Sequence, residues 1–176
     1  MSYLDTSVVV SLIARDSNYN NALSLINQES KELYISTWVL AEAVGVLSRE
    51  LKGGHGSRYE NMVEDMKKNG IPLHPQSMYI YLKTYLVGAM AKYGIKVRDD
   101  PMDVSDQDMG NSHVKTFLVM HEAAVIAADL GLKAPDALHL AYIKRLGLSR
   151  FLTLDKDFTR IRNLIHQQGI EVHGLP

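Results

Sequence analysis

Two aspartates follow short apolar segments, at positions where a strand would end. Asp5 comes directly after Tyr3-Leu4, and Asp155 comes directly after the apolar segment 151–154. In open α/β sheets, ligands bind beyond the carboxyl ends of the strands, near a reversal of strand order. Both aspartates are therefore candidates for a functional site. The alternative is that each one simply caps the helix that follows it.

Two further acids lie in predicted helices. Glu42 has Trp38 and Val46 four residues before and after it, so its own helical face is apolar. A carboxylate on such a face must be paired, protonated or bound to a ligand, because an isolated buried charge is very costly. A buried salt bridge remains an alternative. Asp136 follows Pro135 at a predicted helix start, where an acid also stabilises the first turn.

Three or four carboxylates gathered at one place favour a hard divalent cation. Like charges raise one another's pKa unless a cation neutralises them. Mg²⁺ and Mn²⁺ take oxygen ligands, and such a site can activate water and stabilise the oxygens of a phosphodiester displacement. The sequence contains no His-Glu-x-x-His, Gly-x-Ser-x-Gly, Gly-x-Gly-x-x-Gly or phosphate-loop motif. The acids therefore predict metal-dependent phosphodiester chemistry.

Composition narrows the class of protein. The 176 residues are 46% apolar and 22% charged, which is typical of one globular domain with a real core. No cysteine is present, so disulfides and thiolate metal sites are excluded. No apolar run reaches the roughly 20 residues of a membrane span, and residues 1–5 do not form a signal peptide. We expect a cytoplasmic protein without membrane contact. Its net charge of −1 means that nucleic acid would need a local basic patch.

The elements that must position the acids alternate along the chain. Strands are expected near residues 3–5, 33–36, 95–98, 150–154 and 170–173. Helices are expected after residue 5, around residues 23–26, and over 38–51, 58–69, 76–93, 113–130, 136–146 and 155–168, with loops at 52–57 and 99–108. Alternating strands and helices predict an α/β fold with a largely parallel sheet.

Four segments, in order, carry a family resemblance. They are Tyr3-Leu4-Asp5-Thr6-Ser7, Ser36-Thr37-Trp38-Val39-Leu40-Ala41-Glu42, Pro135-Asp136-Ala137-Leu138-His139-Leu140-Ala141 and Phe151-Leu152-Thr153-Leu154-Asp155-Lys156-Asp157-Phe158. With these segments the sequence resembles the PIN-domain nucleases, and among them the VapC-type toxins. The resemblance implies a three-layer α/β/α PIN-like fold with a mainly parallel central sheet. It also implies a metal-dependent endoribonuclease.

The resemblance assigns roles residue by residue. The implied catalytic acids are Asp5, Glu42, Asp136 and Asp155. The implied ligands of Mg²⁺ or Mn²⁺ are Asp5, Asp136 and Asp155, with Asp157 in reserve. The hydroxyls that would orient a ligand water or a carboxylate are those of Thr6, Ser7 and Thr153. The implied partners are an RNA substrate, a small antitoxin that covers the cleft, and a second copy of the chain in a homodimer.

The middle of the chain departs from the compact toxins. Glu42 and Asp136 are 94 positions apart, so we expect a helical insertion over residues 53–112 within a single PIN-like domain spanning 1–176. This insertion would be a clamp, an oligomer interface or a substrate selector. Its tyrosines, Tyr79, Tyr81, Tyr85 and Tyr93, could stack on bases, although packing is the preferred interpretation.

Substrate contacts are expected from a basic stretch near the C-terminus. Lys156, Arg160 and Arg150 are the candidates for phosphate contacts, and an ordinary solvated helix face is the alternative. The acidic segment 99–108 would repel RNA, so it is expected away from the cleft. His139 lies one helical turn after Asp136; it could touch the site, but a structural role is the preferred interpretation.

Two other functions remain open. A haloacid-dehalogenase-like phosphatase also has an aspartate after its first strand, but it needs a second aspartate where this chain has Ser7. A PIN-like scaffold could instead bind RNA or protein without catalysis. Metal binding separates this second alternative from the nuclease, because a scaffold has no reason to keep clustered carboxylates.

Overall fold

Five short strands form one parallel sheet in the order β3-β2-β1-β6-β7. The computed structural model describes residues 1–29, 32–52, 59–72, 74–99, 103–109 and 112–174. The strands of the sheet are β1 (Ser2–Leu4), β2 (Leu33–Ile35), β3 (Ile95–Val97), β6 (Arg150–Leu152) and β7 (Glu171–His173). The chain places β2 and β3 on one side of β1, then β6 and β7 on the other. Strand order therefore reverses at β1, which is where α/β sheets form a binding crevice.

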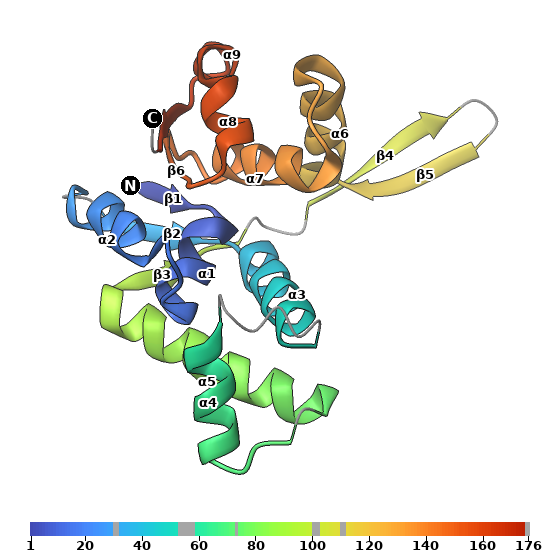
Figure 1. Cartoon of the computed structure of the whole chain (residues 1–176). Coiled ribbons are helices and arrows are strands. Elements are labelled where there is room, and N and C mark those ends of the chain that lie inside the picture. The colour runs from blue at the N-terminus through green and yellow to red at the C-terminus, as the bar shows by residue number, and fades with distance from the viewer. Residues whose placement is uncertain (30–31, 53–58, 73, 100–102, 110–111, 175–176) are drawn as a thin grey trace.

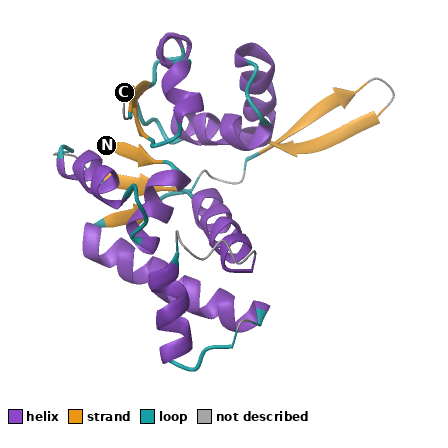
Figure 2. Cartoon of the chain, viewed as in Figure 1, coloured by secondary structure: helices purple, strands orange, loops and turns teal. Residues whose placement is uncertain are grey.

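Helices cover both faces of this sheet (Figures 1 and 2). Their bounds are α1 (Thr6–Ala14), α2 (Tyr19–Asn27), α3 (Thr37–Lys52), α4 (Glu60–Lys68), α5 (Pro75–Tyr93), α6 (Leu118–Leu130), α7 (Ala134–Arg145), α8 (Lys156–Arg160) and α9 (Arg162–Gln167). Figure 1 shows α6 to α9 above the sheet and α3 to α5 below it. The predicted α/β/α fold class is confirmed. None of the described helices combines the length and apolar character that a membrane span requires.

The core is centred on β1 and α1. Tyr3 and Leu4 are fully buried, and in α1 only Ser7 is not buried. The run Val8-Val9-Val10 has modest helix propensity, but burial against α3 and α5 outweighs that preference. This buried helix begins directly after Asp5, so the first candidate acid lies between two buried elements of the core.

The middle of the chain contributes to the same core. The helices predicted over 58–69 and 76–93 are α4 and α5, which bury Met66 and Leu82 completely. Gly94 ends α5 in the left-handed conformation (φ 65°), and β3 then joins the central sheet beside β2. Residues 53–112 therefore supply an edge strand of the sheet as well as helices. Most of the predicted loop 52–57 lies outside the described residues.

A hairpin replaces two of the predicted elements. Residues 99–108 were expected to be a loop and 113–130 a helix. Instead, β4 (Val104–Met109) pairs antiparallel with β5 (Ser112–Phe117), and α6 begins only at Leu118. The reason is visible in residues 113–117, where Val114, Thr116 and Phe117 are β-branched or aromatic residues that favour strands. Figure 1 shows the hairpin projecting away from the body of the molecule.

Two acids of the segment 99–108 have structural partners. Asp99 accepts hydrogen bonds from both the backbone N–H and the hydroxyl of Thr37 at 2.8 Å, so it caps the start of α3. Asp103 forms an ion pair with Arg145 at 3.3 Å.

At the C-terminus, the single helix predicted over 155–168 is two short helices, α8 and α9, separated at Ile161.

Candidate active site

Asp5 lies at the carboxyl end of β1 and is only 4% exposed. Its side chain makes no capping hydrogen bond to α1, so helix capping does not explain it. Instead, Oδ2 accepts hydrogen bonds from Ser7 Oγ at 2.5 Å and from Thr153 Oγ1 at 2.7 Å. Ser7 Oγ also accepts the backbone N–H of Leu154 at 3.0 Å. Two hydroxyls, one in the first turn of α1 and one directly after β6, therefore fix the orientation of this carboxylate.

Asp155 follows β6, the strand that lies next to β1. Its Oδ1 accepts the backbone N–H of Asp157 at 2.8 Å, so this acid does cap α8. Its own backbone N–H donates to Thr153 Oγ1 at 2.9 Å. Thr153 thus bonds both Asp5 and Asp155, which ties the two strand-end acids together.

Glu42 projects from α3 toward the same place. It is half-buried, and its Oε2 accepts the hydroxyl of Thr6 and lies 2.9 Å from His139 Nε2. Burial alone would raise the pKa of Glu42, but the hydrogen bonds from His139 and Thr6 outweigh it and the pKa is lowered. The lone acid on an apolar helical face is therefore paired with an imidazole.

His139 contacts two of the acids at once. The ring is 2% exposed, and its Nε2 lies 3.4 Å from Asp5 Oδ1 as well as close to Glu42. Its Nδ1 lies 3.4 Å from the Tyr3 hydroxyl, which is 2.7 Å from Ser36 Oγ. Burial opposes protonation of the imidazole, but the hydrogen bond to Glu42 and the charge of Asp5 raise its pKa overall.

Asp136 occupies the first turn of α7 and is half-buried. Burial raises its pKa most, the negative charges of Asp155 and Asp5 raise it further, and the positive charges of His139 and Lys133 lower it by less than this total. A group whose pKa is raised by neighbouring carboxylates indicates a cluster of like charge that a cation would relieve.

The four predicted acids line one cavity of about 300 Å³. His139, Thr6 and Ser7 line it too. Sequence reasoning missed Glu50, Asn18 and Tyr59, which also line the cavity. For Glu50 a signal was available, since it follows Glu42 by eight residues on the same face of α3. No described lysine or arginine lines this cavity.

The donor set suits a hard cation, because carboxylate and hydroxyl oxygens are the ligands that Mg²⁺ and Mn²⁺ prefer. Within the described ranges, no three acidic or imidazole side chains are already close enough to hold an ion. Asp157 does not line the cavity; it forms an ion pair with Arg160 at 3.1 Å. The reserve ligand is thus directed elsewhere in this conformation.

The predicted substrate contacts divide into two groups. Lys156 and Arg160 are exposed on α8, directly after Asp155. Arg150 begins β6, at the opposite end of the strand, where it forms an ion pair with Glu29 at 2.8 Å. The structure therefore does not bring Arg150 to the cavity.

Comparison with known proteins agrees with this geometry. Residues 2–71 match the family model of the PIN domain. The chain has the fold of a PIN domain. It is similar to VapC20 from Mycobacterium tuberculosis, a sarcin–ricin loop cleaving toxin, with 17% identity, a TM-score of 0.53, and coverage of 91% of this chain and 94% of that one. It is also similar to PAE2754 from Pyrobaculum aerophilum, with 18% identity, a TM-score of 0.50, and coverage of 94% and 93%. A search of curated proteins finds no significant match. The resemblance predicted from the sequence is thereby confirmed for the fold.

Proposed function

We propose that this PIN domain is a metal-dependent endoribonuclease. One observation carries the proposal: four acids from separate parts of the chain line a single cavity at the strand-order reversal, and no described lysine or arginine lines that cavity. An acidic cavity of this kind has an unfavourable charge unless it serves a cation. The retention of such a cavity favours a catalytic role over a scaffold role.

Asp5, Asp136 and Asp155 are the residues that would hold Mg²⁺ or Mn²⁺. The bound cation would supply an activated water and charge stabilisation at the phosphoryl oxygens. Ser7 and Thr153 hold the Asp5 carboxylate in one orientation through Oδ2. Restricting a ligand in this way lowers the entropy cost of coordination.

Glu42 has a different role in the proposed site. Both of its described contacts, with Thr6 and His139, are made by Oε2. Oε1 is thus the atom that would accept a proton from the attacking water or bind the cation. Thr6 and His139 act as positioning residues, because both contact Glu42 Oε2 and thereby fix its rotamer.

RNA is the proposed substrate, and Lys156 and Arg160 on α8 are the proposed phosphate contacts beside Asp155. The likeness to VapC20, itself a sarcin–ricin loop cleaving toxin, leads us to propose a toxin role with a small antitoxin as partner. A homodimer is part of the same proposal. These assignments extend the resemblance and are separate from the chemistry of the cavity.

The decisive experiment is cleavage of a mixed RNA panel with Mn²⁺, with Mg²⁺ and with a chelator. Wild type is compared with Asp5→Asn and with the control Asp129→Asn, whose carboxylate contacts only Gln168 among the described partners. Cleavage that needs metal, survives in the control and is lost in Asp5→Asn supports the nuclease. Folded wild type that neither cleaves RNA nor gains thermal stability with either metal would instead identify a non-catalytic scaffold.

A further inference from the structure

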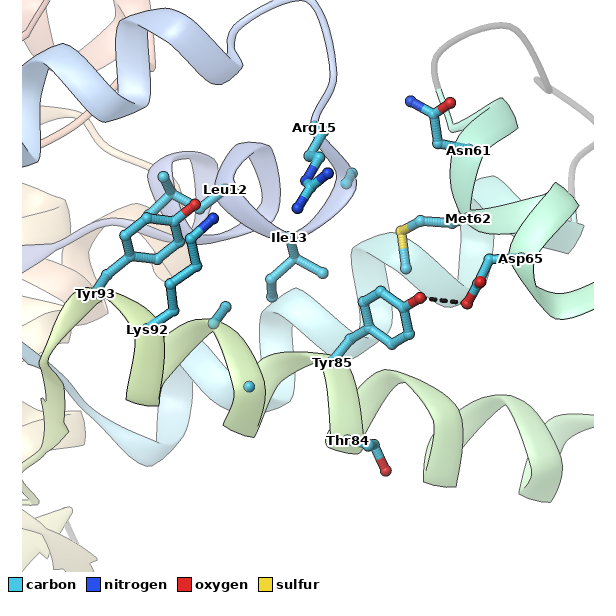
Figure 3. Close-up of a pocket in the computed structure, with 13 residues that line it drawn as sticks. Leu12, Ile13, Arg15, Asn61, Met62, Asp65, Thr84, Tyr85, Lys92 and Tyr93 are labelled. Atoms are coloured by element: carbon cyan, nitrogen blue, oxygen red, sulfur yellow. Dashed lines mark hydrogen bonds between the residues drawn. The ribbon is translucent and has the colours of Figure 1, made fainter. Parts of the chain in front are cut away.

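A second, larger cavity lies at the other end of α1. Its volume is about 620 Å³, which is within the range of binding sites for small ligands. It lies between the end of α1, α4 and α5, and its polar lining includes Arg15, Asn61, Asp65, Tyr85, Lys92 and Tyr93 (Figure 3). The four catalytic candidates do not line it.

The charge of this cavity is opposite to that of the acidic one. Arg15 and Lys92 are exposed on its rim, and neither has an ion-pair partner among the described residues. Asp65 is the acid that lines the cavity, and it already accepts hydrogen bonds from the hydroxyls of Tyr85 and Tyr81. Two cations therefore line this cavity, and the carboxylate of Asp65 is hydrogen-bonded to tyrosines rather than paired with either cation.

Arg15 occupies a backbone position that disfavours its side chain. It ends α1 with φ 52° and ψ 43°, in the left-handed region, and its N–H donates to the Ser11 carbonyl at 3.0 Å. It is the only non-glycine residue with positive φ in the described part of the chain. Glycine is the usual residue at this helix position. A cation held where glycine would be less strained indicates that its side chain is used.

Two tyrosines form fixed aromatic walls beside the cations. The Tyr85 hydroxyl bonds Asp65, and the Tyr93 hydroxyl lies 3.1 Å from that of Tyr19. Lys92 Nζ lies 4.9 Å from the centre of the Tyr93 ring. Cations combined with aromatic rings form the usual surface for single-stranded nucleic acid, because phosphates pair with the former and bases stack on the latter.

We propose that this cavity, hereafter the Arg15–Lys92 pocket, binds a phosphate and base of single-stranded RNA at a distance from the bond that is cut. The inference rests on the proposed ribonuclease function and extends it. The nine residues of α1 span about 13 Å, so one RNA strand can reach both ends of this helix. The charges favour RNA over an apolar protein segment.

RNA binding is measured by fluorescence anisotropy with a labelled single-stranded RNA, in an Asp5→Asn background that prevents cleavage. Arg15→Gln and Lys92→Gln should each weaken binding on the order of fivefold to tenfold at 50 mM salt. Each should also reduce the slope of log K against log salt by about 0.7, the contribution of one phosphate contact. The matched control is Lys83→Gln, an exposed lysine of α5 outside the pocket, which should leave both values unchanged.

A cleavage measurement separates this inference from the proposed function. With Asp5 restored, Arg15→Gln/Lys92→Gln should raise KM for long RNA and leave the cleavage rate of the shortest cleaved RNA unchanged. Wild type that cleaves no RNA refutes the nuclease, and the anisotropy data still decide what the pocket binds. A second outcome is that wild type cleaves RNA and the folded double variant has unchanged affinity, salt slope and KM. This outcome refutes RNA binding by the pocket and leaves the proposed nuclease function intact. Tighter, Arg15-dependent binding of a poly-glutamate peptide would refute RNA as the ligand in favour of an acidic protein segment.

Discussion

The two ends of α1 have opposite chemistry. Its N-terminal end directly follows Asp5 and faces a cavity of carboxylates, whereas its C-terminal end directly precedes Arg15 and faces a pocket with two cations. Both charges complement the helix macrodipole, which is positive at the N-terminus and negative at the C-terminus. One buried helix therefore separates a site suited to a metal cation from a site suited to a phosphate anion.

The two sites also differ in how the chain builds them. Three acids of the acidic cavity, Asp5, Asp136 and Asp155, lie at strand ends or helix starts, and Glu42 projects from within α3. The Arg15–Lys92 pocket is made by side chains on three helices whose positions depend on how α4 and α5 pack. We therefore expect substitutions in the first site to change chemistry and substitutions in the second to change affinity.

The largest effect is expected for Asp136→Asn. Removal of a carboxylate from the cation site should lower the metal-dependent cleavage rate on the order of a hundredfold or more. It should not lower the melting temperature in chelator, since the lost charge faces Asp155 and Asp5. Cleavage kinetics with Mn²⁺ and thermal melting without metal test both statements. An equal loss of stability and activity would show that Asp136 is structural.

His139 provides the next test. His139→Leu removes the donor to Glu42 and should lower the cleavage rate about 10- to 100-fold, as for residues that orient metal ligands. His139→Gln retains a donor and should recover part of the loss. The rate is read together with the Mn²⁺ affinity, which a purely structural role would not change at equal melting temperature. If Gln and Leu behave alike, the hydrogen bond to Glu42 is unimportant.

Most of the acidic site was predictable from the sequence, because the signal that identifies each acid lies in its own neighbouring residues. Asp5 and Asp155 are identified by the strands they follow, and Glu42 by the apolar face around it. The partners of His139 were not predictable, since they come from β1 and α3 and no spacing in the sequence reveals them. Arg150 was predicted to contact phosphate because of its charge alone. The direction of the strand places it at the first residue of β6, at the end opposite to the acidic cavity.

The Arg15–Lys92 pocket and the hairpin were not predictable in the same way. Arg15, Asp65 and Lys92 are far apart in sequence and share no motif, so only the packing of α4 and α5 brings them together. The hairpin was missed because its second strand runs directly into α6 at Leu118 without a glycine or proline between them. Punctuation residues are the main local signal for such a boundary.

Asp65 tests how firmly the walls of the second pocket are held. The hydroxyls of Tyr85 and Tyr81 lower its pKa below the ordinary value of 3.8. A lowered pKa in the folded state stabilises the protein above the ordinary value, and this stability is lost as pH falls through the folded value. Asp65→Asn should therefore melt a few degrees below wild type at neutral pH. At strongly acid pH the two proteins should have the same melting temperature. A difference that is constant with pH would exclude the charge as its cause.

The smallest effect separates conformational strain from ligand binding at Arg15. Arg15→Gly removes the cost of a left-handed arginine, so the free energy of unfolding should rise by about 0.5 to 1 kcal/mol after the entropy cost of glycine. Arg15→Gln keeps the strain and should melt like wild type. Both variants lose the same charge and should bind RNA equally weakly. Greater stability with undiminished RNA affinity in the glycine variant would mean that the strained arginine has no role in binding, and that the polarity of the two cavities is unrelated to the path of the RNA.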